Sequence, residues 1–93
     1  MDFELDGSNR GDLYIVSVRG DVDVYTAPLL DACLQDAIAA GNTELAVDLE
    51  KCAYIDSEGI KVLVKIQRAL GKRGHLAVCA GSGCVQRVFE ISG

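Results

Sequence analysis

Residues 54–67 read YIDSEGIKVLVKIQ, and this stretch decides the fold. A strand-like run breaks into the polar sequence Asp56-Ser57-Glu58-Gly59, and an apolar pattern with interspersed lysines then resumes. Asp and Ser cap helices by accepting backbone N–H bonds, and a Glu in the first turn suits the positive end of the helix dipole. The stretch therefore predicts a strand that gives way to a helix from about Ser57 to Lys72.

Other strands and helices flank this stretch. Thr26 can cap a helix that contains Pro28 in its first turn and stops at Gly41. Val85, Val88 and Phe89 share one face of a further helix in SGCVQRVFEISG at the end of the chain. Strands are predicted from β-rich composition or alternation at residues 3–5 (FEL), 12–20 (DLYIVSVRG), 44–49 (ELAVDL) and 73–80 (RGHLAVCA).

The order of elements is therefore β-β-α-β-α-β-α, an α/β fold in one domain over residues 1–93. The turn-rich sequence DGSNRG at 6–11 joins the first two strands as an antiparallel hairpin. Strands that alternate with helices are parallel neighbours with right-handed crossovers, so the sheet is mixed and packed with helices.

Composition excludes several classes of protein. A net charge of −5 and a pI near 4.6 oppose binding to nucleic acid. No apolar run approaches the roughly 18 residues of a membrane span. The first twelve residues are acidic and lack the apolar segment of a secretory signal, so we expect a cytoplasmic protein.

The four cysteines form no C-x-x-C pair and stand among apolar neighbours, which is typical of small core residues in a reducing compartment. Cys79 and Cys84 are the pair close enough in sequence for a redox clip or half of a metal site. Since His75 is the sole histidine, we predict no metal site. The sequence AGSG at 80–83 lacks the lysine of a phosphate-binding loop, so we predict no cofactor.

Two polar loops lead from strands into helices: GDVDVYT at 20–26 and YIDSEG at 54–59. Functional loops gather at the carboxyl ends of parallel strands, so we expect the two to lie side by side. Ser57 is either part of an ordinary cap or a hydroxyl presented for phosphorylation, with the phosphate held by the dipole and free N–H groups. Gly59 either lets a partner or the facing loop approach or relieves a tight turn.

A catalytic serine is not predicted. A nucleophile elbow is G-x-S-x-G, whereas Ile55 stands two residues before Ser57. A serine nucleophile also needs a base within reach, and His75 opens a strand on the far side of the second helix. We therefore expect no enzyme activity and no catalytic residue.

The sequences GDVDVYTAPLLDACLQDAI and LAVDLEKCAYIDSEGIKVLVKIQRAL, with VQRVFEISG near the end, resemble the STAS domain, and specifically the bacterial anti-sigma-factor antagonists. The resemblance implies a mixed sheet packed with helices and a serine phosphorylated by the partner anti-sigma factor, a serine protein kinase. That serine is Ser57, and a serine phosphatase would reverse the modification. The partner-binding residues implied are Asp21, Asp23, Tyr25, Thr26, Asp56, Glu58, Gly59 and Lys61.

This chain departs from the family pattern at three places. Glu58 stands where the family more often has a small residue, and Lys61 stands where glycine is frequent. The chain stops at Gly93, before the closing strand and helix that the family usually adds. The missing end suggests either a trimmed chain or an apolar surface covered by another copy, so a homodimer is one expectation.

Lys61, Lys65, Arg68 and Lys72 recur at helical spacing and form a basic stripe, which is either a solvated face or a docking strip for an acidic partner. The leading hypothesis is a phosphorylation-switched anti-sigma-factor antagonist. Two alternatives need no phosphorylation: an accessory STAS subunit of an ABC-type lipid transporter, and a signalling scaffold.

Overall fold

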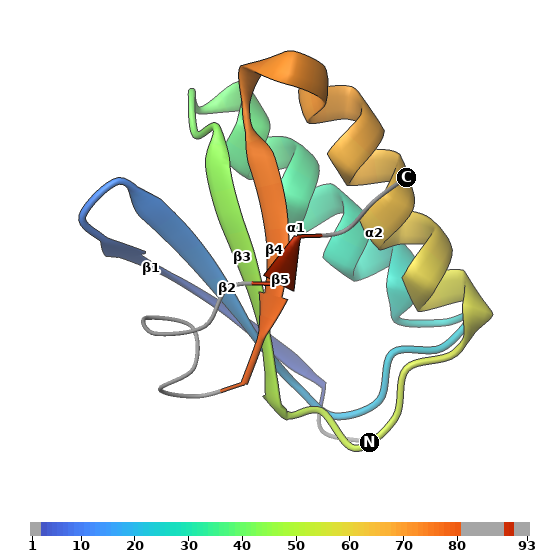
Figure 1. The fold of residues 1–93 in the computed structure, drawn as a ribbon. Coiled ribbons are helices and arrows are strands. Elements are labelled where there is room, and N and C mark those ends of the chain that lie inside the picture. Colours follow the sequence, from blue (N-terminus) through green and yellow to red (C-terminus); the bar gives the residue numbers. More distant parts are fainter. Residues whose placement is uncertain (1–2, 81–88, 91–93) are drawn as a thin grey trace.

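The computed structural model describes residues 3–80 and 89–90, which form one sheet covered on one face by two helices (Figure 1). In chain order the elements are β1 Glu4–Arg10, β2 Leu13–Arg19, α1 Ala27–Ala39, β3 Glu44–Lys51, α2 Ser57–Leu70, the 3₁₀ turn η1 Gly71–Arg73, β4 His75–Cys79 and β5 Phe89–Glu90.

The sheet has five strands in the order β1-β2-β3-β4-β5. β1 is antiparallel to β2, the pairs β2–β3 and β3–β4 are parallel, and β5 is antiparallel to β4. Each parallel pair is connected through a helix, as parallel strands require. The predicted mixed sheet and the order β-β-α-β-α-β are confirmed.

The main core lies between the helices and the sheet. Alternation along the strands turns Val16 and Val47 toward the helices, where they meet Leu30 of α1 and Ile66 of α2, all four at 0% exposure. Each such side chain contributes about 1.5–3 kcal/mol by leaving water. A second, smaller cluster lies on the other face of the sheet and consists of Ile15, Ala46, Ala77 and Cys79, with Leu13 beside it.

The opening hairpin differs from its prediction. β1 continues through the turn-rich residues as far as Arg10, and only Gly11 and Asp12 form the turn. Gly11 has φ 60°, which suits the first position of a two-residue hairpin turn. The predicted turn at 6–11 was wrong because seven pairs with β2, from Glu4 opposite Arg19 to Arg10 opposite Leu13, outweigh the local turn preference of DGSNR.

Near the end of the chain, the structure also differs from the prediction. The predicted last helix is wrong at Phe89, which is in β5 and pairs with Val78 of β4. Residues 81–88, with Val85 and Val88, lie outside the described part of the chain. A helical spacing of three apolar residues is a weak signal over so short a segment, and an open sheet edge at β4 offers hydrogen bonds that a sequence pattern does not reveal.

In the described ranges, no helix has both the length and the apolar character needed to cross a membrane. α2 is the longer helix, at 14 residues, and it ends at Gly71 in a positive-φ conformation before the 3₁₀ turn reaches Arg73. The helix predicted from Ser57 to Lys72 is confirmed: α2 covers most of it, and the 3₁₀ turn η1 covers its last two residues.

Candidate functional site

The two polar loops lie side by side and are hydrogen-bonded to each other. Val22 N donates to Tyr54 O at 2.8 Å, and Asp56 N donates to Val22 O at 3.0 Å. These bonds make an isolated parallel bridge between Val22 and Ile55 beyond the ends of β2 and β3. The predicted neighbourhood of the loops at the carboxyl ends of the strands is therefore confirmed (Figure 1).

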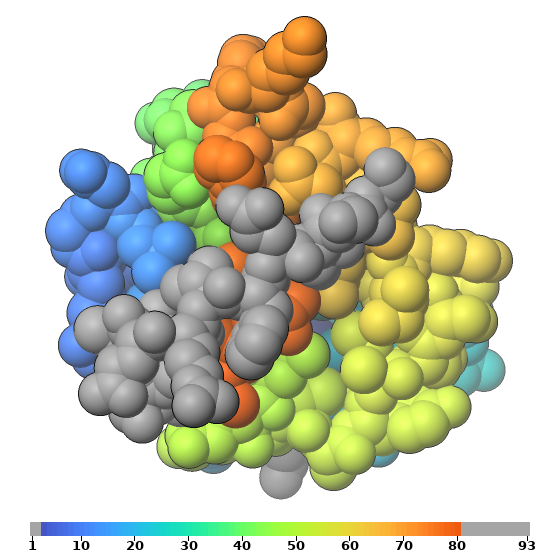
Figure 2. All heavy atoms as spheres, viewed as in Figure 1, coloured from blue at the N-terminus to red at the C-terminus, as the bar shows by residue number. Residues whose placement is uncertain are grey.

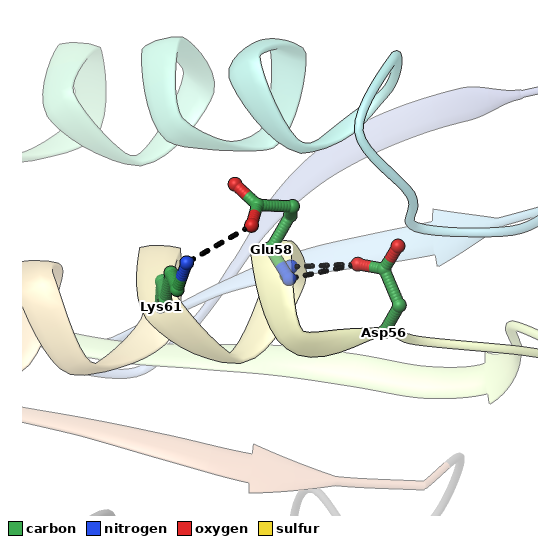
Figure 3. Close-up of polar contacts among 4 residues, drawn as sticks. Asp56, Glu58 and Lys61 are labelled. Carbon is green, nitrogen blue, oxygen red and sulfur yellow. Dashed lines mark hydrogen bonds and ion pairs between the residues drawn. The ribbon is translucent and has the colours of Figure 1, made fainter.

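Asp56 is the N-cap of α2. Its backbone is extended, and its Oδ1 accepts from Glu58 N at 2.8 Å and from Gly59 N at 3.3 Å (Figure 3). The capping function predicted for the polar residues before this helix is thus carried by the Asp56 carboxylate. The N–H groups of Glu58 and Gly59 are not free, which corrects the expectation that a phosphate on Ser57 would find them unoccupied.

Ser57 is the first residue of α2 and is exposed. Within residues 3–80 and 89–90 its hydroxyl makes no hydrogen bond, because the capping bonds are made by its neighbour Asp56. In the space-filling view, the loop before α2 and the first turn of α2, in yellow-green, form part of the molecular surface (Figure 2). The hydroxyl is therefore accessible to another protein.

Gly59 is buried beneath this turn. A Cβ at this position would lie 2.5 Å from Ile55 Cγ1 and 2.7 Å from Val22 Cγ1. The absence of a side chain lets α2 start directly against the bridged loops. Of the alternatives for Gly59, the close approach of the protein's own loop is the one observed.

Asp23 and Thr26 tie the first loop together. Asp23 Oδ1 accepts from Tyr25 N at 2.9 Å and Thr26 N at 3.1 Å, while Thr26 Oγ1 donates to Asp21 O at 2.7 Å and accepts from Asp23 N at 2.9 Å. Thr26 occupies the N-cap of α1, but its hydroxyl makes no capping bond and is 5% exposed. Thr26 therefore shapes the loop from within, whereas Tyr25, 80% exposed, projects from it.

Among the described residues, five large apolar side chains are exposed, and we call them the apolar rim: Val24, Tyr25, Leu29, Tyr54 and Ile60. They come from the two loops and the first turns of the two helices. Of these, the sequence interpretation named only Tyr25 as a site residue. The exposure of Leu29 and Ile60 could have been predicted from helical periodicity. Both are large apolar residues that fall outside the buried face of their helices.

Charged side chains line a groove of about 260 Å³ between the starts of α1 and α2. Lys61 Nζ lies 3.0 Å from Glu58 Oε2, and Lys65 Nζ lies 2.7 Å from Asp31 Oδ2 on the other helix. Both lysines are largely exposed, so each pair stabilises the fold by less than about 1 kcal/mol. Two of the four cations of the basic stripe are thus paired within the chain.

His75 is far from Ser57. It opens β4 opposite Glu44, the first residue of β3, and its Nδ1 lies 3.2 Å from the Glu44 carboxylate. Ser57 follows the other end of β3, so the length of an eight-residue strand, about 25 Å, separates the two side chains. This geometry excludes His75 as a base for Ser57.

Cys33 and Cys52 are free thiols, both half-buried. Burial, assisted by the Asp36 carboxylate, raises the pKa of Cys33, which keeps this thiol protonated and weakly nucleophilic. Cys79 is buried and disulfide-bonded, which departs from the expectation of a reduced core cysteine. Cys84, its predicted neighbour in a redox clip, lies outside the described residues.

Comparison with known families gives one match over nearly the whole chain: residues 5–93 match the STAS domain. An anti-sigma-B factor antagonist of Staphylococcus aureus (strain NCTC 8325 / PS 47) is 32% identical over 94 residues, which cover all of this chain and 87% of that protein.

Solved structures agree with the fold. The crystal structure of an anti-sigma factor antagonist from Mycobacterium paratuberculosis has a TM-score of 0.78 and 27% identity, covering 92% of this chain and 74% of that one. The anti-sigma factor antagonist SpoIIAA in its unphosphorylated form has a TM-score of 0.68 over 92% of this chain and 79% of its own. At 19% identity, the second likeness shows the shared fold.

Proposed function

The chain belongs to the STAS domain family, and we propose that it is an anti-sigma-factor antagonist switched by phosphorylation of Ser57. In the unphosphorylated state it binds an anti-sigma factor in the cytoplasm, and a sigma factor is released. The anti-sigma factor, a serine protein kinase, modifies Ser57, and a serine phosphatase restores the hydroxyl. The protein itself is a regulatory binding module and not an enzyme.

The observation that carries the proposal is an accessible serine hydroxyl with two exposed members of the apolar rim, Tyr54 and Ile60, on either side of it in the chain. Tyr54 and Ile60 stand three residues before and three after Ser57 and are 57% and 48% exposed. A group of exposed large apolar side chains on a domain this small is typical of a protein interface, and aromatic residues supply much of the binding energy at such surfaces. A phosphate on Ser57 would thus lie within the area that a partner covers.

Burial divides the predicted partner-binding residues into two groups. Tyr25, Glu58 and Lys61 have accessible side chains and are proposed to contact the partner, together with the half-buried Asp21, Asp23 and Asp56. Thr26 and Gly59 are buried and act by positioning: the first holds its loop closed, and the second lets α2 approach the bridge between the loops.

The charge of a phosphate is sufficient for the switch. Phosphorylation adds about −1.5 to −2 charges at neutral pH. At a separation of about 8 Å and an effective dielectric constant of 20 to 40, each pair of unit charges interacts by roughly 1–2 kcal/mol. Repulsion from two or three carboxylates on the partner then costs on the order of 3 kcal/mol, about a hundredfold in affinity.

The backbone around Ser57 does not have to change conformation for the switch to work. The backbone on both sides of Ser57 is held by the Val22–Ile55 bridge and by the Asp56 cap. A modification at a rigid helix start changes charge and bulk where the partner binds, which is a local electrostatic event.

The test is incubation with ATP and a candidate anti-sigma kinase, followed by mass spectrometry of the intact protein and calorimetry of kinase binding. We expect one phosphate that Ser57→Ala abolishes, and loss of binding on modification. Ser8→Ala, at an exposed serine of β1, is the matched control and should be phosphorylated normally.

Kinase binding that yields no phosphate on Ser57, or binding that persists after Ser57 is modified, would contradict the switch. Co-purification with an ABC-type ATPase would instead favour the transporter subunit, and a large assembly of many copies would favour the scaffold. A homodimer stays a prediction, which light scattering on the same samples measures.

A further inference from the structure

A phosphate on Ser57 would find the amides of the three residues that follow it occupied. The N–H groups of Glu58 and Gly59 both donate to Asp56 Oδ1, and Ile60 N donates to Asp56 O at 3.1 Å. The Asp56 carboxylate also places a negative charge on that side of Ser57. These three amides are therefore not available to a phosphate, and the group that can supply a full positive charge to it is a cationic side chain.

Lys61 is that side chain. It follows Ser57 by four residues in α2, so the two lie on one face of the helix with their Cβ atoms about 5–6 Å apart. Long side chains on a helix point back toward its N-terminus, which directs the Lys61 ammonium over the turn that holds Ser57. Its Nζ lies 3.0 Å from Glu58 Oε2, next to Ser57 in the chain, and its side chain is 72% exposed (Figure 3).

The other charged groups near the groove do not compete for this role. Lys65 is eight residues from Ser57 and is bound at 2.7 Å to Asp31 of α1. Glu58 and Asp56 are anions. Among the described residues around the start of α2, Lys61 is the cation that can reach Ser57 by a change of side-chain rotamer.

We infer that, when Ser57 is phosphorylated, the Lys61 ammonium breaks its ion pair with the Glu58 carboxylate and forms one with the phosphate. The inference rests on the proposed function for the modification itself. A phosphate dianion attracts an ammonium more strongly than a carboxylate of single charge, and it offers three acceptor oxygens. The exposed pair between Glu58 and Lys61 holds too weakly to oppose the exchange.

The exchange changes the binding surface in two ways at once. It withdraws a cation that an acidic group of the partner could use, and it leaves the Glu58 carboxylate unpaired at the interhelical groove. The phosphorylated surface therefore differs from the unphosphorylated one by more than the phosphate itself.

Phosphoserine installed at position 57 during translation tests the exchange without any kinase. The second pKa of the phosphate, near 6 for an ordinary phosphoserine, is measured by ³¹P NMR titration at 0.15 M salt. Lys61→Gln should raise this pKa by about 0.5, the size expected for an exposed ion pair, and Lys61→Arg should restore it. Glu58→Gln, which removes the competing carboxylate, should lower it by a few tenths.

Lys65→Gln is the matched control, since it removes an ion-paired lysine from the same stripe beyond the reach of Ser57. Equal pKa values in wild type, Lys61→Gln and Lys65→Gln would overturn the inference. Failure of kinases to modify Ser57 contradicts the proposed function and leaves this titration unaffected, so the two ideas fail separately.

Discussion

The starts of α1 and α2 use the same kinds of residue in opposite ways. Each follows a parallel strand, and each has an aspartate and a hydroxyl residue where the helix begins. At α1 the Thr26 hydroxyl is buried and makes hydrogen bonds within its loop. At α2 the Asp56 carboxylate makes the capping bonds, and the Ser57 hydroxyl is left exposed. A hydroxyl becomes available for modification when a neighbour takes over its structural role.

The largest expected effect comes from breaking the contact between the two helix starts. Gly59→Val should destabilise the protein by about 3 kcal/mol, because a side chain at this position overlaps Ile55 and Val22. Urea unfolding measures the loss. Ile60→Val puts the same side chain one residue further on, at an exposed position, and should change stability by less than about 1 kcal/mol.

The next effect concerns the buried hydroxyl at α1. Thr26→Ala should cost about 2 kcal/mol of unfolding free energy, since Asp21 O and Asp23 N each lose a hydrogen bond in a site that is 5% exposed. Urea unfolding monitored by circular dichroism measures this. A loss below about 0.5 kcal/mol would mean that the loop is held by the Asp23 carboxylate alone.

The cap of α2 is expected to contribute less. Asp56→Ala should destabilise the protein by about 1 kcal/mol because two first-turn amides lose their acceptor, and Asp56→Asn should retain most of the stability. Thermal unfolding of the two variants side by side checks this. Equal losses in both would show that charge, and not capping geometry, is what matters.

The smallest effect is expected at the exposed hydroxyl of α2. Ser57→Ala should change stability by less than about 0.5 kcal/mol, since the exposed hydroxyl makes no bond within the described residues. Urea unfolding, as for Thr26→Ala, measures the loss of unfolding free energy in each variant, and the two losses can be compared directly. A cost as large as that of Thr26→Ala would assign Ser57 a structural role and weaken its proposed role as a free phosphorylation site.

Local chemistry predicted a large part of this arrangement. Pro28 in the first turn and the stop at Gly41 mark α1, and Asp56 and Ser57 mark the start of α2. Both signals lie within a few residues of a helix end. Predictions failed where pairing between strands decided the outcome. DGSNR extends in β1 because it pairs with β2, and Phe89 is in β5 because the edge of β4 was open to it.

Local patterns in the sequence were sufficient to predict the order of strands and helices as far as β4, the two polar loops that enter the helices, and the serine that follows the capping aspartate. These depend on periodicity and on hydrogen bonds between near neighbours in the chain. Only the tertiary structure decided that Thr26 is buried and Ser57 exposed, that Gly59 accommodates Val22 and Ile55, and that Leu29 and Ile60 stay uncovered. Exposure depends on contacts between residues more than 30 positions apart, such as Val22 and Ile55, which local patterns do not encode.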